Sequence, residues 1–242
     1  MSYKLEKYSL PELKKMALDM DLQMRRSKGE MIKDITAAFK EYEEYKREKI
    51  DKYKRCEQLG EKGKEGTTFL VKDRNGREFA MKTFRREKSS STLKREFLLQ
   101  KKASRKNITP RVYEYDTVSK YIVMEKMDKH LYDEIKNKGV LCKKYQERIL
   151  EIFDKLDQAG VFHGDANILN YMIKDGEVYI IDFGFSKEIT PQVLKKLETS
   201  RPNYHLMTIG LILKLKELSL DEKSYKYLKK ALPVEYLGKY KL

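Results

Sequence analysis

The sequence predicts an α+β fold of two lobes, a small antiparallel β lobe followed by a minimal helical lobe, with a helical hairpin at the N-terminus. Three observations support this expectation. Strand-like segments gather around one helical pattern (93–104), at 69–71, 78–81, 112–115 and 121–125. Helical patterns dominate afterwards, at 131–137, 143–158, 191–199, 205–217 and 221–232. Two short amphipathic helices precede them, within residues 9–40.

The N-terminal hairpin carries two helix-start signals. Ser9 is a suitable N-cap with Pro11 in the first turn, and Ser27 with Glu30 forms a capping box. We expect one apolar face on each helix, made of Leu10, Leu13, Ala17 and Leu18 on the first and Met31, Ile32, Ile35 and Phe39 on the second.

This helix–turn–helix order resembles the SAP-type module, a family that usually binds DNA. The resemblance implies a module over residues 1–45 with a DNA contact through residues 9–40. The alternative is a hairpin that packs on the rest of the protein or on a protein partner. Residues 41–53 are rich in Glu, Lys and Tyr and predict a polar helical segment, so we place a linker at 46–55.

The net charge of +15 is unevenly distributed. Residues 1–50 carry about +2, residues 51–110 about +10 and residues 111–242 about +3. Such a field attracts nucleotides, nucleic acid, anionic membranes or acidic proteins, and the alternative is a lysine-rich solvated surface.

Cysteine and histidine are too sparse for a zinc site. Cys56 and Cys142 lie far apart without metal-ligand spacing, and the chain has three histidines. We expect reduced thiols in a cytoplasmic or nuclear protein. An N-terminal apolar run and an 18-residue apolar stretch are both absent from the sequence, which predicts neither a signal peptide nor a membrane span.

The most informative motif combines His163-Gly164-Asp165, Asn170 five residues after Asp165, and Asp182-Phe183-Gly184. One carboxylate can face a hydroxyl while an amide and a second carboxylate hold Mg²⁺ against ATP phosphates. Residues 178–181 read as a buried strand that delivers Asp182 to this site.

Two further motifs lie in the β lobe. Gly60, Gly63 and Gly66 are spaced G-x-x-G-x-x-G before a strand, where glycines let a backbone approach phosphates. Lys82 ends a Phe-Ala-Met-Lys strand, and Glu96 follows fourteen residues later on the predicted helix.

In motif order, residues 56–186 resemble the protein-kinase-like superfamily. The resemblance implies a kinase-like domain over 56–242, with an N-lobe at about 56–126 and a C-lobe at about 127–242. It assigns Asp165 to the substrate hydroxyl, Asn170 and Asp182 to Mg²⁺, and Lys82 with Glu96 to the α/β-phosphates of ATP. It also implies adenine contacts from the backbones of Glu125 and Met127, with Met124 lining the pocket, and places His163 beneath the loop.

The sequence departs from the common protein-kinase pattern in three places. Gly164 replaces the arginine that usually reads an activation-loop phosphate, A-P-E is missing, and His205 stands where an aspartate is common. Short H-G-D forms resemble the RIO group, the small kinase of the KEOPS complex and compact kinases of large DNA viruses, which would allow a viral source and packaging in a virion. They also resemble aminoglycoside and choline phosphotransferases.

These resemblances imply a Mg·ATP-dependent Ser/Thr protein kinase with a protein substrate, no membrane partner and DNA contact through its N-terminal module. Two alternatives stay open. One is a small-molecule phosphotransferase of the aminoglycoside or choline kinase type. The other is an ATP-binding pseudokinase that acts as a binding module.

Overall fold

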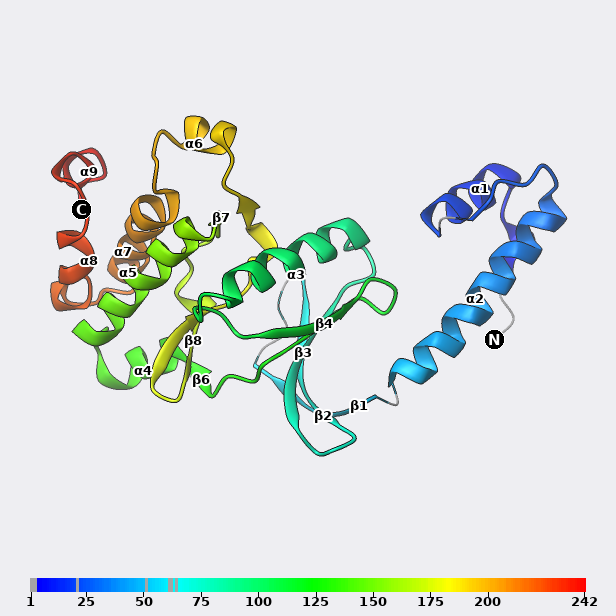
Figure 1. Cartoon of the computed structure of the whole chain (residues 1–242), viewed down its shortest axis with the longest axis horizontal. Coiled ribbons are helices and arrows are strands. Elements are labelled where there is room, and N and C mark those ends of the chain that lie inside the picture. The colour runs from blue at the N-terminus through cyan, green and yellow to red at the C-terminus, as the bar shows by residue number, and fades with distance from the viewer. Residues whose placement is uncertain (1–3, 21, 51, 61–62, 64) are drawn as a thin grey trace. The chain divides into compact units, whose positions relative to one another are not determined.

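The computed structural model describes residues 4–20, 22–50, 52–60, 63 and 65–242. The chain divides into two compact units (Figure 1). The first comprises Met1–Lys54 with Lys72–Gly76, and the second comprises Arg55–Val71 with Arg77–Leu242.

The first unit is built from a 3₁₀ turn at Leu5–Lys7, α1 (Leu10–Asp19) and α2 (Lys28–Ile50). Both helix starts are capped as predicted, since Glu12 Oε2 accepts from Ser9 N at 2.7 Å and Ser27 Oγ accepts from Glu30 N at 3.2 Å. The unit has its own small core of Leu5, Leu13, Ala17, Met31 and Ile35.

Two expectations about this unit differ from the structure. The sequence pattern places Leu18 on the buried face of α1, but its side chain is 63% exposed, because one residue further along a helix turns about 100° away from Ala17. The polar segment 41–53 is helical as predicted as far as Ile50, but the predicted linker 46–55 also contains the first residues of β1 (Tyr53–Leu59).

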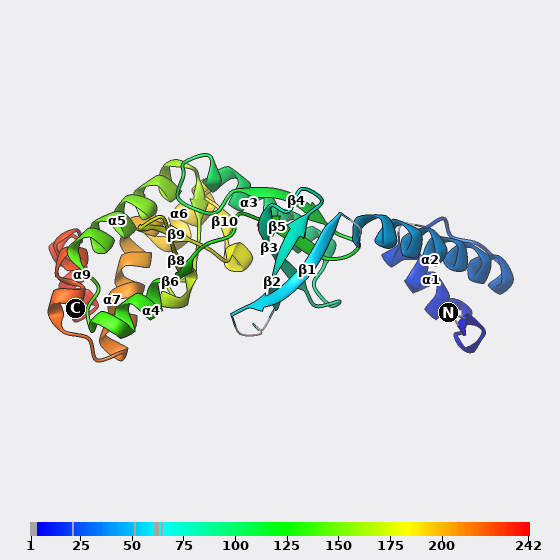
Figure 2. The same cartoon turned by 90° about the horizontal axis from the view of Figure 1, so that it is seen from below.

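The β lobe is a five-stranded sheet with the order β1-β2-β3-β5-β4. Its further strands are β2 (Gly66–Asp73), β3 (Glu78–Phe84), β4 (Val112–Asp116) and β5 (Tyr121–Met124), and Figure 2 shows β1 and β2 side by side. The pairs β3/β5 and β4/β5 are antiparallel, with Lys82 opposite Ile122. Helix α3 (Ser90–Ser104) packs on β4, and its Leu93 and Phe97 join the apolar cluster under the sheet.

The helical lobe consists of α4 (Leu131–Lys138), α5 (Lys143–Gln158), α6 (Pro191–Leu197), α7 (Thr208–Glu217), α8 (Lys226–Lys230) and α9 (Val234–Lys239). Short strands accompany these helices, namely β6 (Lys129–His130), β7 (Val161–Phe162), β8 (Tyr171–Lys174), β9 (Glu177–Ile180) and β10 (Lys187–Glu188). They form a β6-β8-β9 sheet and a β7-β10 pair.

Helix boundaries follow the predicted pattern for α4 and α5 and depart from it nearer the C-terminus. The first three residues of the predicted helix 205–217 belong to a π-helical turn, Asn203–Met207, which leads directly into α7. The predicted helix 221–232 is broken into a 3₁₀ turn, Glu222–Ser224, and α8, because Tyr225 has a non-helical backbone with φ −140°.

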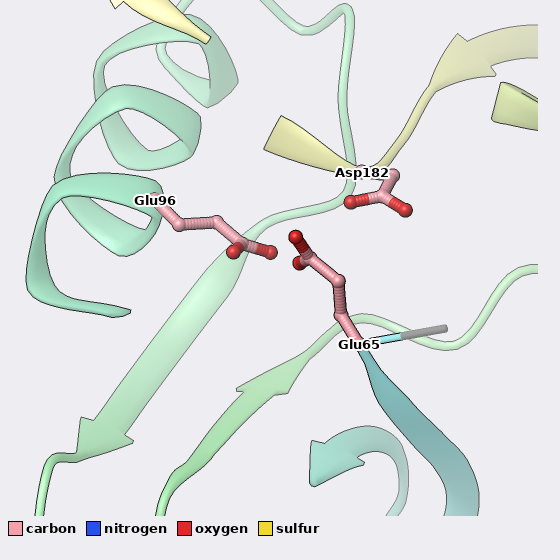
Figure 3. Close-up of side chains that lie close together, drawn as sticks. All are labelled: Glu65, Glu96 and Asp182. Atoms are coloured by element: carbon pink, nitrogen blue, oxygen red, sulfur yellow. The ribbon is translucent and has the colours of Figure 1, made fainter. Parts of the chain in front are cut away.

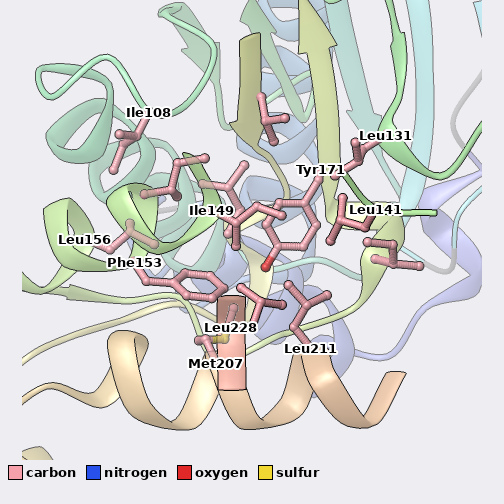
Figure 4. Packing of buried hydrophobic residues seen from close by; sticks show 14 of the residues in the cluster. Ile108, Leu131, Leu141, Ile149, Phe153, Leu156, Tyr171, Met207, Leu211 and Leu228 are labelled. Carbon is pink, nitrogen blue, oxygen red and sulfur yellow. The ribbon is translucent and has the colours of Figure 1, made fainter. Parts of the chain in front are cut away.

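The main hydrophobic core lies in the helical lobe (Figure 4). Phe153 of α5 and Tyr171 of β8 are fully buried at its centre, and their rings are 6.4 Å apart. Leu99 and Ala103 of α3 also belong to this core, so one helix is packed into both lobes. Burying a large apolar side chain completely in such a core stabilises the fold by about 1.5–3 kcal/mol.

The α+β, two-lobed kinase-like fold expected from the sequence is therefore confirmed. Within the part of the chain that the structure describes, no helix combines the length and the apolar character needed to cross a membrane.

Candidate active site

The loop that carries Asp165 and Asn170 leaves β7 through Gly164. Gly164 has φ +80°, a conformation that favours glycine, and a Cβ there would stand 3.3 Å from the backbone oxygen of Phe185. A glycine in place of the common arginine therefore has a local structural reason in this chain.

His163 connects this loop to the end of β9. The ring is fully buried, with Nε2 3.0 Å from the backbone oxygen of Ile181, and it packs edge-on against Phe183. Burial lowers the pKa of His163 below its ordinary value, so the ring is neutral and Nε2 carries the proton that it donates to Ile181.

Asn203 supports the same loop from below. Its side chain is fully buried, and Oδ1 accepts from His163 N at 2.9 Å. Its Nδ2 donates to Asp157 Oδ1 at 2.7 Å and to Val161 O at 2.8 Å. The sequence resemblance pointed to His205 at this place, but the His205 ring lies 2.8 Å from the hydroxyl of Thr199 instead.

Asp165 and Asn170 stand at the two ends of a tight turn. Asp165 Oδ1 accepts from Asn167 N at 3.1 Å, and Asn170 N donates to Asn167 O at 3.0 Å. Asn170 Nδ2 lies 3.4 Å from Asp165 O, a long contact. The half-buried Asp165 carboxylate is thereby oriented by its own loop.

Asp182 follows β9 in a strained conformation. Its φ of +65° is unusual for a residue other than glycine and costs about 1–3 kcal/mol. Ile181 N donates to Asn170 O at 2.8 Å, which joins the backbones on which Asn170 and Asp182 stand. An amide oxygen and a carboxylate are donors that suit Mg²⁺, so these two side chains fit the metal that the sequence predicts.

Lys82 on β3 bridges two acidic side chains from distant segments. Its Nζ lies 2.9 Å from Glu96 Oε1 on α3 and 2.8 Å from Asp182 Oδ1. Burial alone would lower the pKa of Lys82, but the charges of Glu96 and Asp182 outweigh it and raise the pKa well above its usual range. For Asp182, burial acts to raise the pKa, but the charge and hydrogen bond of Lys82 prevail and lower it.

A third carboxylate, that of Glu65, reaches the same place from the glycine-rich segment (Figure 3). Oxygens of Glu65, Glu96 and Asp182 all lie within 4.8 Å of one another. A second lysine, Lys88, contacts Glu65 Oε2 at 2.6 Å and Glu96 Oε2 at 2.5 Å. The cluster therefore combines three carboxylates with two ammonium groups.

The three glycines of the sequence motif have different surroundings. A Cβ on Gly66 would come within 2.0 Å of Thr83 O, so this glycine is required by the close approach of β3. Gly60 has φ +68° at the end of β1, and a Cβ on Gly63 would stand 3.4 Å from Gly66 O. A packing reason thus exists for Gly66 independently of any phosphate.

The segment expected to contact adenine follows β5. Glu125 N already donates to Arg111 O at 2.8 Å, so an adenine contact from Glu125 can use only its carbonyl oxygen. The Glu125 carboxylate pairs with Lys174, and Met127 is buried. Met124 lies on β5 opposite Ala80 of β3.

A cavity of about 230 Å³ adjoins the loop of Asp165 on the helical lobe. Asn167, Ile168 and Leu169 form one wall, and Tyr132, Lys214, Glu217 and Leu218 form the others. Leu169 is 48% exposed, so this surface beside the loop is apolar.

The structure pairs Lys82 with Glu96 as the sequence suggested and adds a contact between Lys82 and Asp182. The sequence did not foresee the roles of Lys88, Glu65 and Asn203. Lys88 is one of many lysines, and its partners lie 8 and 23 residues away, so the sequence has no signal for it. Asn203 lies only two residues before the position that the sequence singled out.

Comparisons with known proteins bear on the family of the chain. Residues 53–205, well over half of the chain, match the family described as protein kinase domain. A probable bifunctional tRNA threonylcarbamoyladenosine biosynthesis protein of Methanosphaera stadtmanae is 37% identical over 79 residues, 33% of this chain and 15% of that protein. KEOPS complex subunit Bud32 of Pyrococcus abyssi is 33% identical over 84 residues, 32% of this chain and 36% of Bud32.

A probable serine/threonine-protein kinase of Bacillus subtilis, YbdM, is 33% identical over 54 residues, 22% of this chain and 21% of that kinase. The chain thus matches little more than a third, or less, of the length of these curated relatives. Because the domain match spans the lysine, the loop and the Asp-Phe-Gly turn described above, the chain belongs to the protein kinase family.

Proposed function

We propose that this protein is a Mg·ATP-dependent Ser/Thr protein kinase, which transfers the γ-phosphate of ATP to a protein hydroxyl. The observation that carries the proposal is the Lys82 ammonium held between Glu96 and Asp182, which come from segments 14 and 100 residues away along the chain. Such a fixed positive charge beside a carboxylate suits the phosphates of a nucleotide.

The roles follow from chemistry and position. Lys82 binds the α/β-phosphates, and Glu96 orients it. Asn170 and Asp182 would hold Mg²⁺, and the bound ion would supply positive charge against the phosphates. The Asp165 carboxylate orients the acceptor hydroxyl and receives its proton as the new O–P bond forms and the bond to the ADP oxygen breaks.

The nucleotide would lie between the glycine-rich segment and the strand that ends at Met124. In this arrangement Gly60, Gly63 and Gly66 cover the phosphates, and adenine contacts the Glu125 carbonyl and the Met127 backbone. The occupied N–H of Glu125 means that Met127 supplies the donor.

The choice of a protein acceptor is supported by the similarity to YbdM, a probable serine/threonine-protein kinase, and by the apolar cavity beside Asn167 and Leu169, where a side chain of a bound peptide can sit. The relatives from Methanosphaera stadtmanae and Pyrococcus abyssi are named for tRNA threonylcarbamoyladenosine biosynthesis and for the KEOPS complex. These names favour an atypical kinase that works within a larger assembly.

The test is transfer from γ-labelled ATP with Mg²⁺ to casein, histone and myelin basic protein. Asp182→Ala should reduce labelling by at least about a hundredfold, because it removes a ligand that acts on the transition-state charge. Asp133→Ala is the matched control, since Asp133 is an exposed aspartate on α4. Equal labelling by the Asp182→Ala and control proteins would contradict the site assignment.

The other two candidates give different results in the same experiment. A small-molecule phosphotransferase would label alcohol substrates such as choline or aminoglycosides and leave the proteins unlabelled. A pseudokinase would be stabilised by ATP against thermal unfolding without transferring phosphate to any acceptor.

We further propose that residues 1–45 form a separate SAP-like module that directs the kinase to DNA. Two capped helices around their own apolar core support the idea of a module. Exposed Arg26 and Lys33 offer charges for phosphates, whereas Arg25 is paired with Asp34 at 2.7 Å.

A further inference from the structure

Lys88 lies outside every motif that the sequence singles out, yet its ammonium group is part of the site. It stands in the segment between β3 and α3, and its side chain is only 8% exposed. Its Nζ contacts Glu96 Oε2 at 2.5 Å and Glu65 Oε2 at 2.6 Å, and it lies 4.2 Å from the centre of the Phe84 ring. A lysine with this burial and these partners is fixed in place.

The backbone around Lys88 is held as firmly as its side chain. The Lys120 ammonium donates to Lys88 O at 2.6 Å and also to Arg86 O. Immediately afterwards, Ser89 caps α3, with its hydroxyl accepting from Thr92 N at 3.1 Å. The Lys88 ammonium therefore acts from a rigid support at the start of the helix that carries Glu96.

The two lysines divide the Glu96 carboxylate between them. Oε1 is bound by Lys82 and Oε2 by Lys88, and the Glu96 side chain is 2% exposed. A buried carboxylate with one partner would compete strongly for the Lys82 charge. With Lys88 on the second oxygen, more of the Lys82 charge is available for phosphates.

We infer that Lys88 is a positioning residue for the nucleotide, which acts through Glu96 and Glu65. Its ion pairs with Glu96 and Glu65 hold α3 and the glycine-rich segment beside the site. This inference rests on the proposed kinase function.

The test compares Lys88→Gln with Lys88→Arg, and with Lys94→Gln as a matched control on the exposed side of α3. Lys88→Gln should raise the KM for ATP about tenfold while kcat falls by less than about threefold, because it weakens ground-state positioning of the phosphates. Lys88→Arg should recover most of the affinity, and Lys94→Gln should match the wild type.

A thermodynamic cycle with Glu96→Gln tests the route of the effect. Once Glu96 is neutral, the further change Lys88→Gln should alter ATP affinity clearly less than it does in the wild type, because the part of the effect that passes through Glu96 is already lost and only the contact with Glu65 remains. Additive effects of the two substitutions, or a folded Lys88→Gln protein with the ATP affinity of the Lys94→Gln control, would overturn the inference.

Hydrogen exchange of the α3 amides without nucleotide separates this inference from the proposed function. If the wild type binds no Mg·ATP, the proposed function fails. In that case, faster exchange of the α3 amides in Lys88→Gln than in Lys94→Gln still supports the positioning role of Lys88. Equal exchange in the two variants overturns that role. If Lys88→Gln does not fold, Glu65→Gln decides, because it removes one of the two carboxylates on the same ammonium. Unchanged exchange over residues 88–94 in that variant would overturn the inference.

Discussion

Asn203 is suited to its place because its side chain both accepts and donates hydrogen bonds. Its three neighbours are one donor, His163 N, and two acceptors, Asp157 Oδ1 and Val161 O. An ionised aspartate could satisfy the first but would place a carboxylate against the other two. The amide therefore matches a local pattern that an aspartate at this position would not.

His163 should make folding stability depend on pH. Its folded-state pKa is lowered by burial from 6.5, so below pH 6.5 the unfolded chain binds more protons than the folded protein. The stability contribution of the neutral ring is thus present above pH 6.5 and is lost as the pH falls below it, by at most about 1.4 kcal/mol per pH unit.

Denaturant unfolding of the wild type and His163→Gln between pH 7.5 and 5.5 measures this effect. The variant should lose less stability over this range than the wild type. His205→Gln is the control, because burial and Arg201 lower the pKa of His205 as well and its contribution must be separated. Identical pH slopes for the wild type and His163→Gln would show that the buried ring does not act in this way.

Among the elements, α7 approaches the candidate active site through a glycine. A Cβ on Gly210 would stand 2.8 Å from the Cβ of Ala166, the residue next to Asp165. Gly210→Ala should therefore move the loop or α7 by several tenths of an ångström. We expect kcat to fall about tenfold or more, because small displacements of catalytic groups are costly.

Gly238→Ala is the matched control, since Gly238 also lies in a helix and a Cβ there meets nothing within 4 Å. It should leave activity unchanged and stabilise the protein slightly through helix propensity, by up to about 1 kcal/mol. Steady-state kinetics and thermal unfolding of both variants measure the difference. Full activity in Gly210→Ala would mean that the loop adapts to the added methyl group without cost.

Elements with a strong apolar period could be predicted from the sequence. The pattern at 143–158 predicts α5, and that at 131–137 predicts α4, which has one residue more. The pattern at 221–232 failed because its continuity depends on the backbone of Tyr225, which periodicity does not report. The pairing of Lys82 with Glu96 could be predicted because motif spacing encodes it. The second contact of Lys82, with Asp182, and the contacts of Lys88 depend on how distant segments meet in space, which spacing does not report.

For the molecule as a whole, the separation of hydrophobic cores is the main organising feature. The first unit buries Leu13, Met31 and Ile35 among themselves, whereas the kinase lobes have two other clusters. Helix α2 continues to Ile50, and Tyr53 of β1 is buried, so a deletion that ends at Ile50 removes the whole of α2 and leaves β1 intact, whereas a cut at residue 45 would divide α2.

Deleting residues 1–50 should leave kinase activity within about twofold of the full chain, because a domain with its own core can fold alone. Steady-state kinetics and thermal unfolding of the truncated and full-length proteins measure this. A truncated chain that unfolds or loses activity would show that the kinase lobes depend on the first unit.

The same truncation tests DNA targeting. The removed segment carries only about +2, whereas residues 51–110 carry about +10, so some salt-sensitive binding to any polyanion should persist. The module's contribution is therefore measured from the salt dependence of binding to duplex DNA. The slope of log K against log salt concentration should become shallower by about 0.9 for each DNA phosphate that the truncated chain no longer neutralises. Arg26→Gln with Lys33→Gln in the full chain should reproduce part of that change while preserving the hairpin core. If the truncated chain binds duplex DNA with the affinity and salt slope of the full chain, residues 1–50 are not the DNA-binding element.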